Sequence, residues 1–138
     1  MKLYSKLFIL LISFSIFSCK GQTSKNVINL DPKPFSEKIT ATPNAQVIDV
    51  RTPREFAGGH LDNALNIDWL NDTFEANAQK LDKTKPVFVY CKTSNRSPQA
   101  AAKLEELGFK TIYNMQGGLL KWDAEGLSKP TDRIIGVC

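Results

Sequence analysis

The residues best suited to covalent chemistry lie in one short segment, where an apolar run leads into a cysteine and a polar loop. Val87–Tyr90 is β-branched and aromatic, which predicts a buried strand, and Cys91 follows it directly. Ser97 is a good helix N-cap, and a helix is predicted from Pro98 to Leu107. The cysteine should therefore face the backbone N–H groups of the loop and the positive end of a helix dipole.

These surroundings favour the thiolate form of Cys91, which is the nucleophilic form of a cysteine. The loop amides, the helix dipole and the cations Lys92 and Arg96 would each stabilise a negatively charged sulfur. A buried structural cysteine is the alternative, because free cysteines are common in protein cores. We favour the reactive thiol, since a structural cysteine needs no cationic loop at the start of a helix.

The length of the loop indicates what the sulfur would carry. Four residues separate Cys91 from Arg96, whereas phosphatases with a similar loop separate their cysteine and arginine by five. The tighter ring of amides suits one extra sulfur atom, held on the cysteine as a persulfide. The residues expected to surround the substrate are Lys92, Thr93, Ser94, Asn95, Arg96 and Ser97.

At this loop the chain resembles the rhodanese family of sulfurtransferases, whose active loop commonly reads Cys-Arg-x-Gly-x-Arg after a strand that ends in Tyr. Ser94 stands where glycine is frequent, at a position where a positive φ would strain any residue with a Cβ atom. The stretch from Val47 to Ile67 resembles the family's first signature, and Met115 to Gly126 resembles its second, a Gly-Gly pair followed by Trp. The resemblance implies an α/β fold: one rhodanese-like domain, a parallel sheet with helices on both faces.

Charged residues in and after the strand 47–50 could be an acid/base set, but a charge network that fixes a turn is the simpler explanation. Asp49, Arg51 and Glu55 are the members of this network, and the i, i+4 spacing of the last two allows them to pair. Thr52 is expected to cap the short helix that follows. His60 is the only histidine, so it cannot build a zinc site without other ligands, and its position is structural in the family that the chain resembles. We expect no metal and no cofactor.

The N-terminal 18 residues predict a signal peptide, because Lys2 and Lys6 precede an apolar stretch too short to span a bilayer. The stretch ends at Ser18-Cys19, which resembles a bacterial lipobox, so Cys19 is expected to be lipidated. A plain secretory signal that is cleaved elsewhere is the alternative. The expected organisation is a signal peptide at 1–18, a lipidated cysteine with linker at 19–26, and a rhodanese-like domain at 27–138. The protein would then be a membrane-anchored lipoprotein of the bacterial cell envelope, facing the periplasm.

Alternating elements follow the linker, as expected for a parallel sheet. We predict strands at 27–30, 47–50, 64–67, 87–90 and 111–115, and helices at 35–39, 53–58, 69–81, 98–107 and 119–125. Loss of Lys2 and Lys6 would lower the formal net charge from +4 to +2, and no basic stripe is visible. No nucleic-acid partner is therefore expected.

The favoured function is a sulfurtransferase that moves a sulfane sulfur from thiosulfate or a persulfide to a thiol or cyanide through Cys91. A redox partner protein could supply the acceptor thiol. A phosphatase or arsenate reductase is disfavoured because Ser97, and not an arginine, stands six residues after Cys91. A non-catalytic binding module of the same fold is credible only where the cysteine is missing. Cys138 could resolve the persulfide, although a terminal thiol without a function is the simpler explanation.

Overall fold

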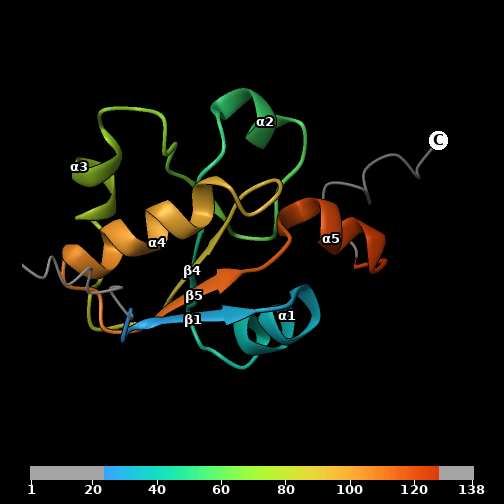
Figure 1. Ribbon diagram of the computed structural model, residues 1–138, viewed down its shortest axis with the longest axis horizontal. Coiled ribbons are helices and arrows are strands. Elements are labelled where there is room, and N and C mark those ends of the chain that lie inside the picture. The colour runs from blue at the N-terminus through green and yellow to red at the C-terminus, as the bar shows by residue number, and fades with distance from the viewer. Residues whose placement is uncertain (1–23, 128–138) are drawn as a thin grey trace, which may run out of the picture.

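The computed structural model describes residues 24–127, which fold around a five-stranded parallel sheet of order β1-β5-β4-β2-β3 (Figure 1). The strands are β1 (Val27–Leu30), β2 (Gln46–Asp49), β3 (Leu65–Asn66), β4 (Val87–Tyr90) and β5 (Ile112–Met115). The helices are α1 (Pro32–Thr40), α2 (Pro53–Ala57), α3 (Phe74–Ala78), α4 (Arg96–Glu106) and α5 (Gly118–Ala124). The predicted signal peptide, Cys19 and Cys138 lie outside the described residues.

Strand β4 lies in the middle of the sheet, and its four residues have no exposed surface. Val87 and Val89 belong to the core cluster that includes residues of α3 and α4, whereas Phe88 and Tyr90 belong to the cluster that includes residues of α1 and α5. Alternate side chains of a strand point to opposite faces, so both faces of the sheet carry helices (Figure 1). The predicted fold class is confirmed.

All five strands run in the same direction, so their carboxyl ends lie together along one side of the sheet. Asp49 pairs with Tyr90 in register on this side, and Asn66 pairs with Asp49. Cys91 follows Tyr90 directly. The polar residues that the sequence places after separate strands are thereby gathered around one cysteine. No helix within residues 24–127 is long and apolar enough to cross a bilayer.

Several element boundaries differ from the sequence prediction. The helix predicted at 69–81 is reduced to the five residues of α3, because Asp68 and Asn71 accept backbone N–H groups two residues ahead and form turns instead. The strand predicted at 64–67 pairs over only two residues, and α1 begins earlier, at Pro32. Proline suits the first turn of a helix, which explains the earlier start of α1.

Candidate active site

The Cys91 thiol lies at the carboxyl end of β4, with an exposed fraction of 0% for the residue. The backbone N–H of Ser94 donates a hydrogen bond to Sγ over 3.1 Å, and the thiol donates to Oγ of Ser97 over 3.4 Å. Burial raises the pKa of the thiol, but the hydrogen bonds of Ser97 and of the loop amides outweigh burial and lower the pKa overall. The site therefore favours the thiolate.

The prediction that Ser97 caps the helix is wrong. Helix α4 begins two residues earlier than predicted, at Arg96, and Asn95 is its N-cap residue with helical angles of φ −91° and ψ −48°. The polypeptide turns into the helix before it reaches Ser97, so this buried side chain faces the sulfur instead of a free backbone amide. Once the thiol has lost its proton, the hydroxyl can reverse its role and donate to Sγ.

The loop is attached to the start of α5. The N–H of Leu119 donates to the carbonyl of Cys91 over 3.0 Å, and the N–H of Leu120 donates to the carbonyl of Lys92 over 3.0 Å. Gly118, at φ +59°, makes this approach possible, because a Cβ atom there would lie 2.4 Å from the carbonyl oxygen of Lys92. The first turn of α5 thus takes the loop carbonyls and leaves the loop amides for the sulfur. Gly117 and Gly118, both with positive φ, form the tight turn that leads from β5 into α5.

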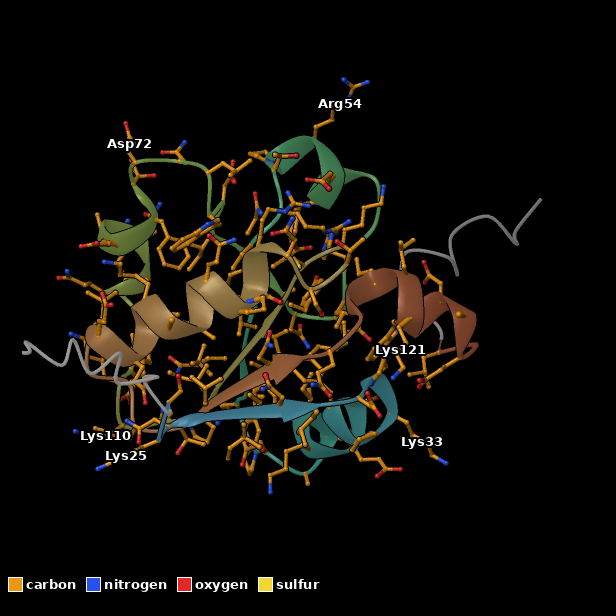
Figure 2. The ribbon with its side chains drawn as sticks, in the orientation of Figure 1. Lys25, Lys33, Arg54, Asp72, Lys110 and Lys121 are labelled. Atoms are coloured by element: carbon orange, nitrogen blue, oxygen red, sulfur yellow. The ribbon has the colours of Figure 1, made fainter. Side chains whose placement is uncertain are left out.

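Arg96 forms a bidentate ion pair with Glu55 of α2, with N–O distances of 2.7 and 2.9 Å. Thr52 and Glu55 form a capping box, so the Glu55 carboxylate is held from both sides. The pKa of Glu55 is lowered to about 2, chiefly by its hydrogen bonds to Arg96. Because both terminal nitrogens of Arg96 contact Glu55, this ion pair holds α2 against the loop. Arg54, also on α2, extends away from the protein (Figure 2).

The expected pairing of Arg51 with Glu55 is wrong. Arg51 pairs instead with the fully buried carboxylate of Asp49 over 2.6 Å and also donates to the carbonyl of Gly59 over 2.7 Å. Asn66, which the sequence did not single out as a site residue, donates to the carbonyls of Asp49 and Arg51. These bonds join β2, β3 and the turn before α2, which supports a network that fixes the edge of the sheet.

The remaining predicted residues divide into exposed and supporting ones. Lys92, Thr93 and Asn95 are exposed on the outside of the loop. His60 stacks on Phe56 with ring centroids 3.7 Å apart, and its Nδ1 lies 2.9 Å from the carbonyl oxygen of Phe56. Among residues 24–127, no group of three His, Cys, Asp or Glu side chains could hold a metal ion.

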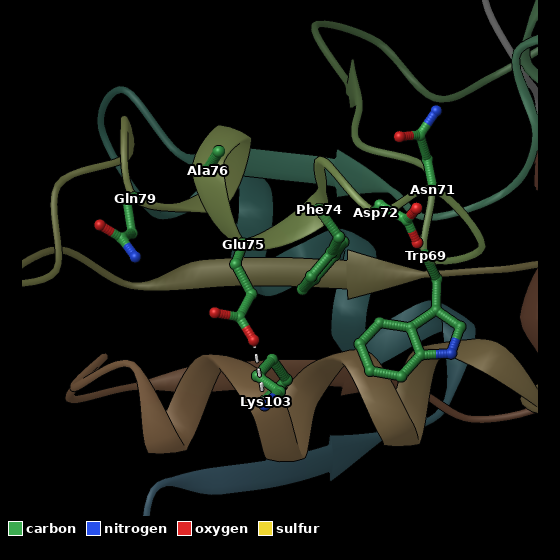
Figure 3. Close-up of a pocket in the computed structure, with 8 residues that line it drawn as sticks. All are labelled: Trp69, Asn71, Asp72, Phe74, Glu75, Ala76, Gln79 and Lys103. Carbon is green, nitrogen blue, oxygen red and sulfur yellow. Dashed lines mark ion pairs between the residues drawn. The ribbon is translucent and has the colours of Figure 1, made fainter.

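A cavity of about 500 Å³ lies between α3 and α4 (Figure 3). Its lining comes from α3, from the segments on either side of α3, and from Lys103 of α4. The Nζ of Lys103 contacts the carboxylate of Glu75 across the cavity over 3.1 Å. Trp69 and Phe74 form its aromatic part, in a T-shaped contact with ring centroids 4.9 Å apart. The polar groups around the Cys91 sulfur are supplied by a different part of the fold.

Comparison with known proteins connects this geometry to a family. The family model described as a rhodanese-like domain matches residues 31–125. An uncharacterized protein of Bacillus subtilis is 46% identical over 56% of this chain, and the match spans 60% of that relative's length. A sulfurtransferase of Allochromatium vinosum is 30% identical over 73% of this chain and 92% of its own. The solution structure of a homodimeric polysulfide-sulfur transferase from Wolinella succinogenes is 39% identical, covers 75% of this chain and 77% of its own, and has a TM-score of 0.63.

Proposed function

The chain belongs to the rhodanese-like domain family, and from this premise we propose that it is a sulfurtransferase that carries sulfur as a persulfide on Cys91. One observation carries the proposal. The buried sulfur of Cys91 accepts a hydrogen bond from the backbone N–H of Ser94 and contacts the hydroxyl of Ser97. The pKa of the thiol is lowered in spite of burial. Donors aimed at a buried sulfur stabilise negative charge there more strongly than they would in water.

The reaction has two displacements. The Cys91 thiolate attacks the sulfane sulfur of a donor such as thiosulfate, forming an S–S bond while the donor's own S–S bond breaks and sulfite leaves with the electron pair. An acceptor thiolate or cyanide then attacks the outer sulfur, forming an acceptor persulfide or thiocyanate, and the Cys91 thiolate is released. The hydrogen bonds that stabilise the thiolate also stabilise it as the leaving group of the second step.

The loop also bears on the choice of donor. Arg96 is engaged by Glu55, which leaves the loop amides and the exposed Lys92 to meet the anionic end of a donor. A persulfide or polysulfide places less charge beside the attacked sulfur than thiosulfate does. We therefore propose persulfides and polysulfides as donors alongside thiosulfate. A cyanide ion, a small thiol or a thiol of a redox partner protein would serve as acceptor.

The buried position of Cys91 sets a condition on the reaction. A donor reaches Sγ only when the groups that cover it move aside, because Cys91 has no exposed surface. The same enclosure would shield the persulfide from water and from unrelated thiols.

Intact mass spectrometry after exposure to a donor tests the proposal. The protein should gain one sulfur atom on the peptide that contains Cys91, lose it on addition of cyanide with formation of thiocyanate, and show neither step as Cys91→Ser. The donors compared in parallel are thiosulfate, glutathione persulfide and polysulfide. In a separate assay, an aryl phosphate tests the alternative function, a phosphatase. Absence of the added mass with every donor, or hydrolysis of the phosphate that depends on Cys91, would refute it.

We also propose that the domain is attached to the envelope membrane through lipidated Cys19, with the site facing the periplasm. The charged start, apolar stretch and Ser18-Cys19 junction of the sequence support this proposal.

A further inference from the structure

Ser94 has an unusual backbone conformation for a residue with a side chain. Its φ is +69°, and the other two residues of positive φ that are not glycine within residues 24–127 are Asn44 and Asn63. Asparagine tolerates the left-handed region because its short polar side chain bonds to the nearby backbone, but serine has a weaker preference for it. The conformation costs about 1 kcal/mol or more, so something in the structure must hold it.

The hydroxyl of Ser94 supplies that hold. It donates to the carbonyl oxygen of Met115 over 3.1 Å, at the end of β5. The register between β4 and β5 ends with the pair Val89 and Asn114, one residue before Met115. The side chain of Ser94 therefore bonds to the next carbonyl of β5 after the pairing with the backbone of β4 has ended.

The backbone N–H of the same residue points at the sulfur of Cys91, 3.1 Å away. We propose that Ser94 is a positioning residue, whose hydroxyl bond to the Met115 carbonyl holds the left-handed backbone that directs the Ser94 amide at the sulfur. Its importance for sulfur transfer depends on the function proposed above. The contact between amide and sulfur can, however, be tested with no sulfur donor present.

Two substitutions separate the hydroxyl from the backbone conformation. Ser94→Ala keeps the strain of a Cβ atom and loses the hydroxyl, so the loop should relax and the amide should turn away from Sγ. Ser94→Gly also loses the hydroxyl, but glycine adopts a positive φ without strain. A structural role that needed only the hydroxyl bond would affect both variants alike, whereas a role in holding φ affects alanine much more.

The pH dependence of Cys91 alkylation by iodoacetamide, followed by peptide mapping, measures the thiol pKa directly. One hydrogen bond of ordinary net strength changes an equilibrium by about three- to tenfold, so we expect the thiol pKa in Ser94→Ala to rise by roughly 0.5–1. Ser94→Gly should show less than half of that rise. Asn63→Ala, at φ +57° in the turn before β3, is the matched control for alanine in a left-handed position and should leave the thiol pKa unchanged.

An unshifted pKa in Ser94→Ala would overturn the proposal, and so would equal shifts in the alanine and glycine variants. If the expected shifts appear but the wild-type protein accepts sulfur from no donor, the proposed function fails and the positioning role stands.

Discussion

At the scale of single residues, the charge of the loop is set by one ion pair that links segments far apart in the sequence. The sequence alone predicts that Arg96 stabilises a negatively charged sulfur, but both of its terminal nitrogens contact Glu55, 41 residues away. The guanidinium is therefore largely neutralised by a carboxylate from α2. The sulfur owes its stabilisation mainly to neutral donors, namely the hydroxyl of Ser97 and the loop amides.

Glu55→Gln tests this ion pair through the pH dependence of stability. The folded pKa of Glu55 is about 2, below its ordinary value of 4.5, so the native state binds the proton more weakly than the unfolded state does. The stabilisation is fully present above pH 4.5 and is lost as the pH falls from about 4.5 towards 2. We expect wild type to exceed Glu55→Gln by about 1–2 kcal/mol in unfolding free energy at pH 7, and by much less at about pH 2.5.

Urea denaturation at a series of pH values provides the measurement. Glutamine can still complete a capping box, so the variant removes the charge and spares the start of α2. Glu75→Gln, which breaks the more exposed pair with Lys103, is the control and should change the stability by less than about 0.5 kcal/mol at any of these pH values. Parallel curves for wild type and Glu55→Gln would show that the ion pair contributes nothing.

At the scale of elements, the junction between β5 and α5 determines which way the loop faces. N–H groups at the start of α5 donate to the carbonyls of Cys91 and Lys92. The carbonyl of Met115, at the end of β5, accepts a hydrogen bond from the hydroxyl of Ser94. Because the carbonyl and the N–H of one trans peptide group point in opposite directions, holding the carbonyls of Cys91 and Lys92 at α5 turns the N–H groups of Lys92 and Thr93 away from α5. The sulfur site is thus shaped by α5 as well as by α4.

Gly118→Ala should damage this junction. A Cβ atom would lie 2.4 Å from the backbone of Lys92, and the φ of +59° adds strain. We expect a loss of about 2–4 kcal/mol in unfolding free energy, together with a higher thiol pKa, because the loop must move away from α5. Thermal or urea denaturation and iodoacetamide alkylation measure the two effects.

Gly126→Ala is the matched control for Gly118→Ala. Gly126 has a similar φ of +69°, but nothing lies within 4 Å of the position that a Cβ atom would take, so alanine there meets only the conformational strain. Its cost should be about 1 kcal/mol, with no change in the thiol pKa. Equal costs for the two variants would mean that the close approach of α5 to the loop is unimportant.

At the scale of the whole molecule, the parallel sheet separates the site from the proposed membrane anchor. Cys91 lies at the carboxyl ends of the strands, whereas Val27, the first residue of β1, lies at the amino ends. Seven residues separate Cys19 from Val27, and this length of chain spans at most about 30 Å when fully extended. A lipid on Cys19 would therefore hold the start of β1 within about 30 Å of the bilayer surface.

Cys19→Ala tests the anchor. The variant should leave the membrane fraction or accumulate as a precursor of altered cleavage, because the thioether to the lipid needs the sulfur of that residue. Cell fractionation with mass analysis of the amino terminus supplies the measurement, and Cys91→Ser, which should remain in the membrane fraction, is the control. A soluble wild-type protein with an amino terminus other than Cys19 would rule out the lipoprotein.

Local patterns in the sequence determined most of the framework. The strands β1 and β4 have the predicted limits. For β4 the reason is that a short run of β-branched and aromatic residues has few alternatives in a buried sheet. Thr52 caps α2 as predicted, since a capping box depends on residues that lie close together in the chain. The sequence also identified the strained position of Ser94.

Only the tertiary structure decided which groups meet around the sulfur. Glu55 pairs with Arg96 rather than with Arg51, and Ser94 bonds to Met115, 21 residues away. No spacing rule along the chain predicts such partners, because they depend on which strands lie side by side and how far each helix extends. The start of α4 at Arg96 escapes prediction for a related reason: Ser97 has the side chain of a good cap, but the packing of the loop places that hydroxyl on the sulfur, and its bond there replaces a cap.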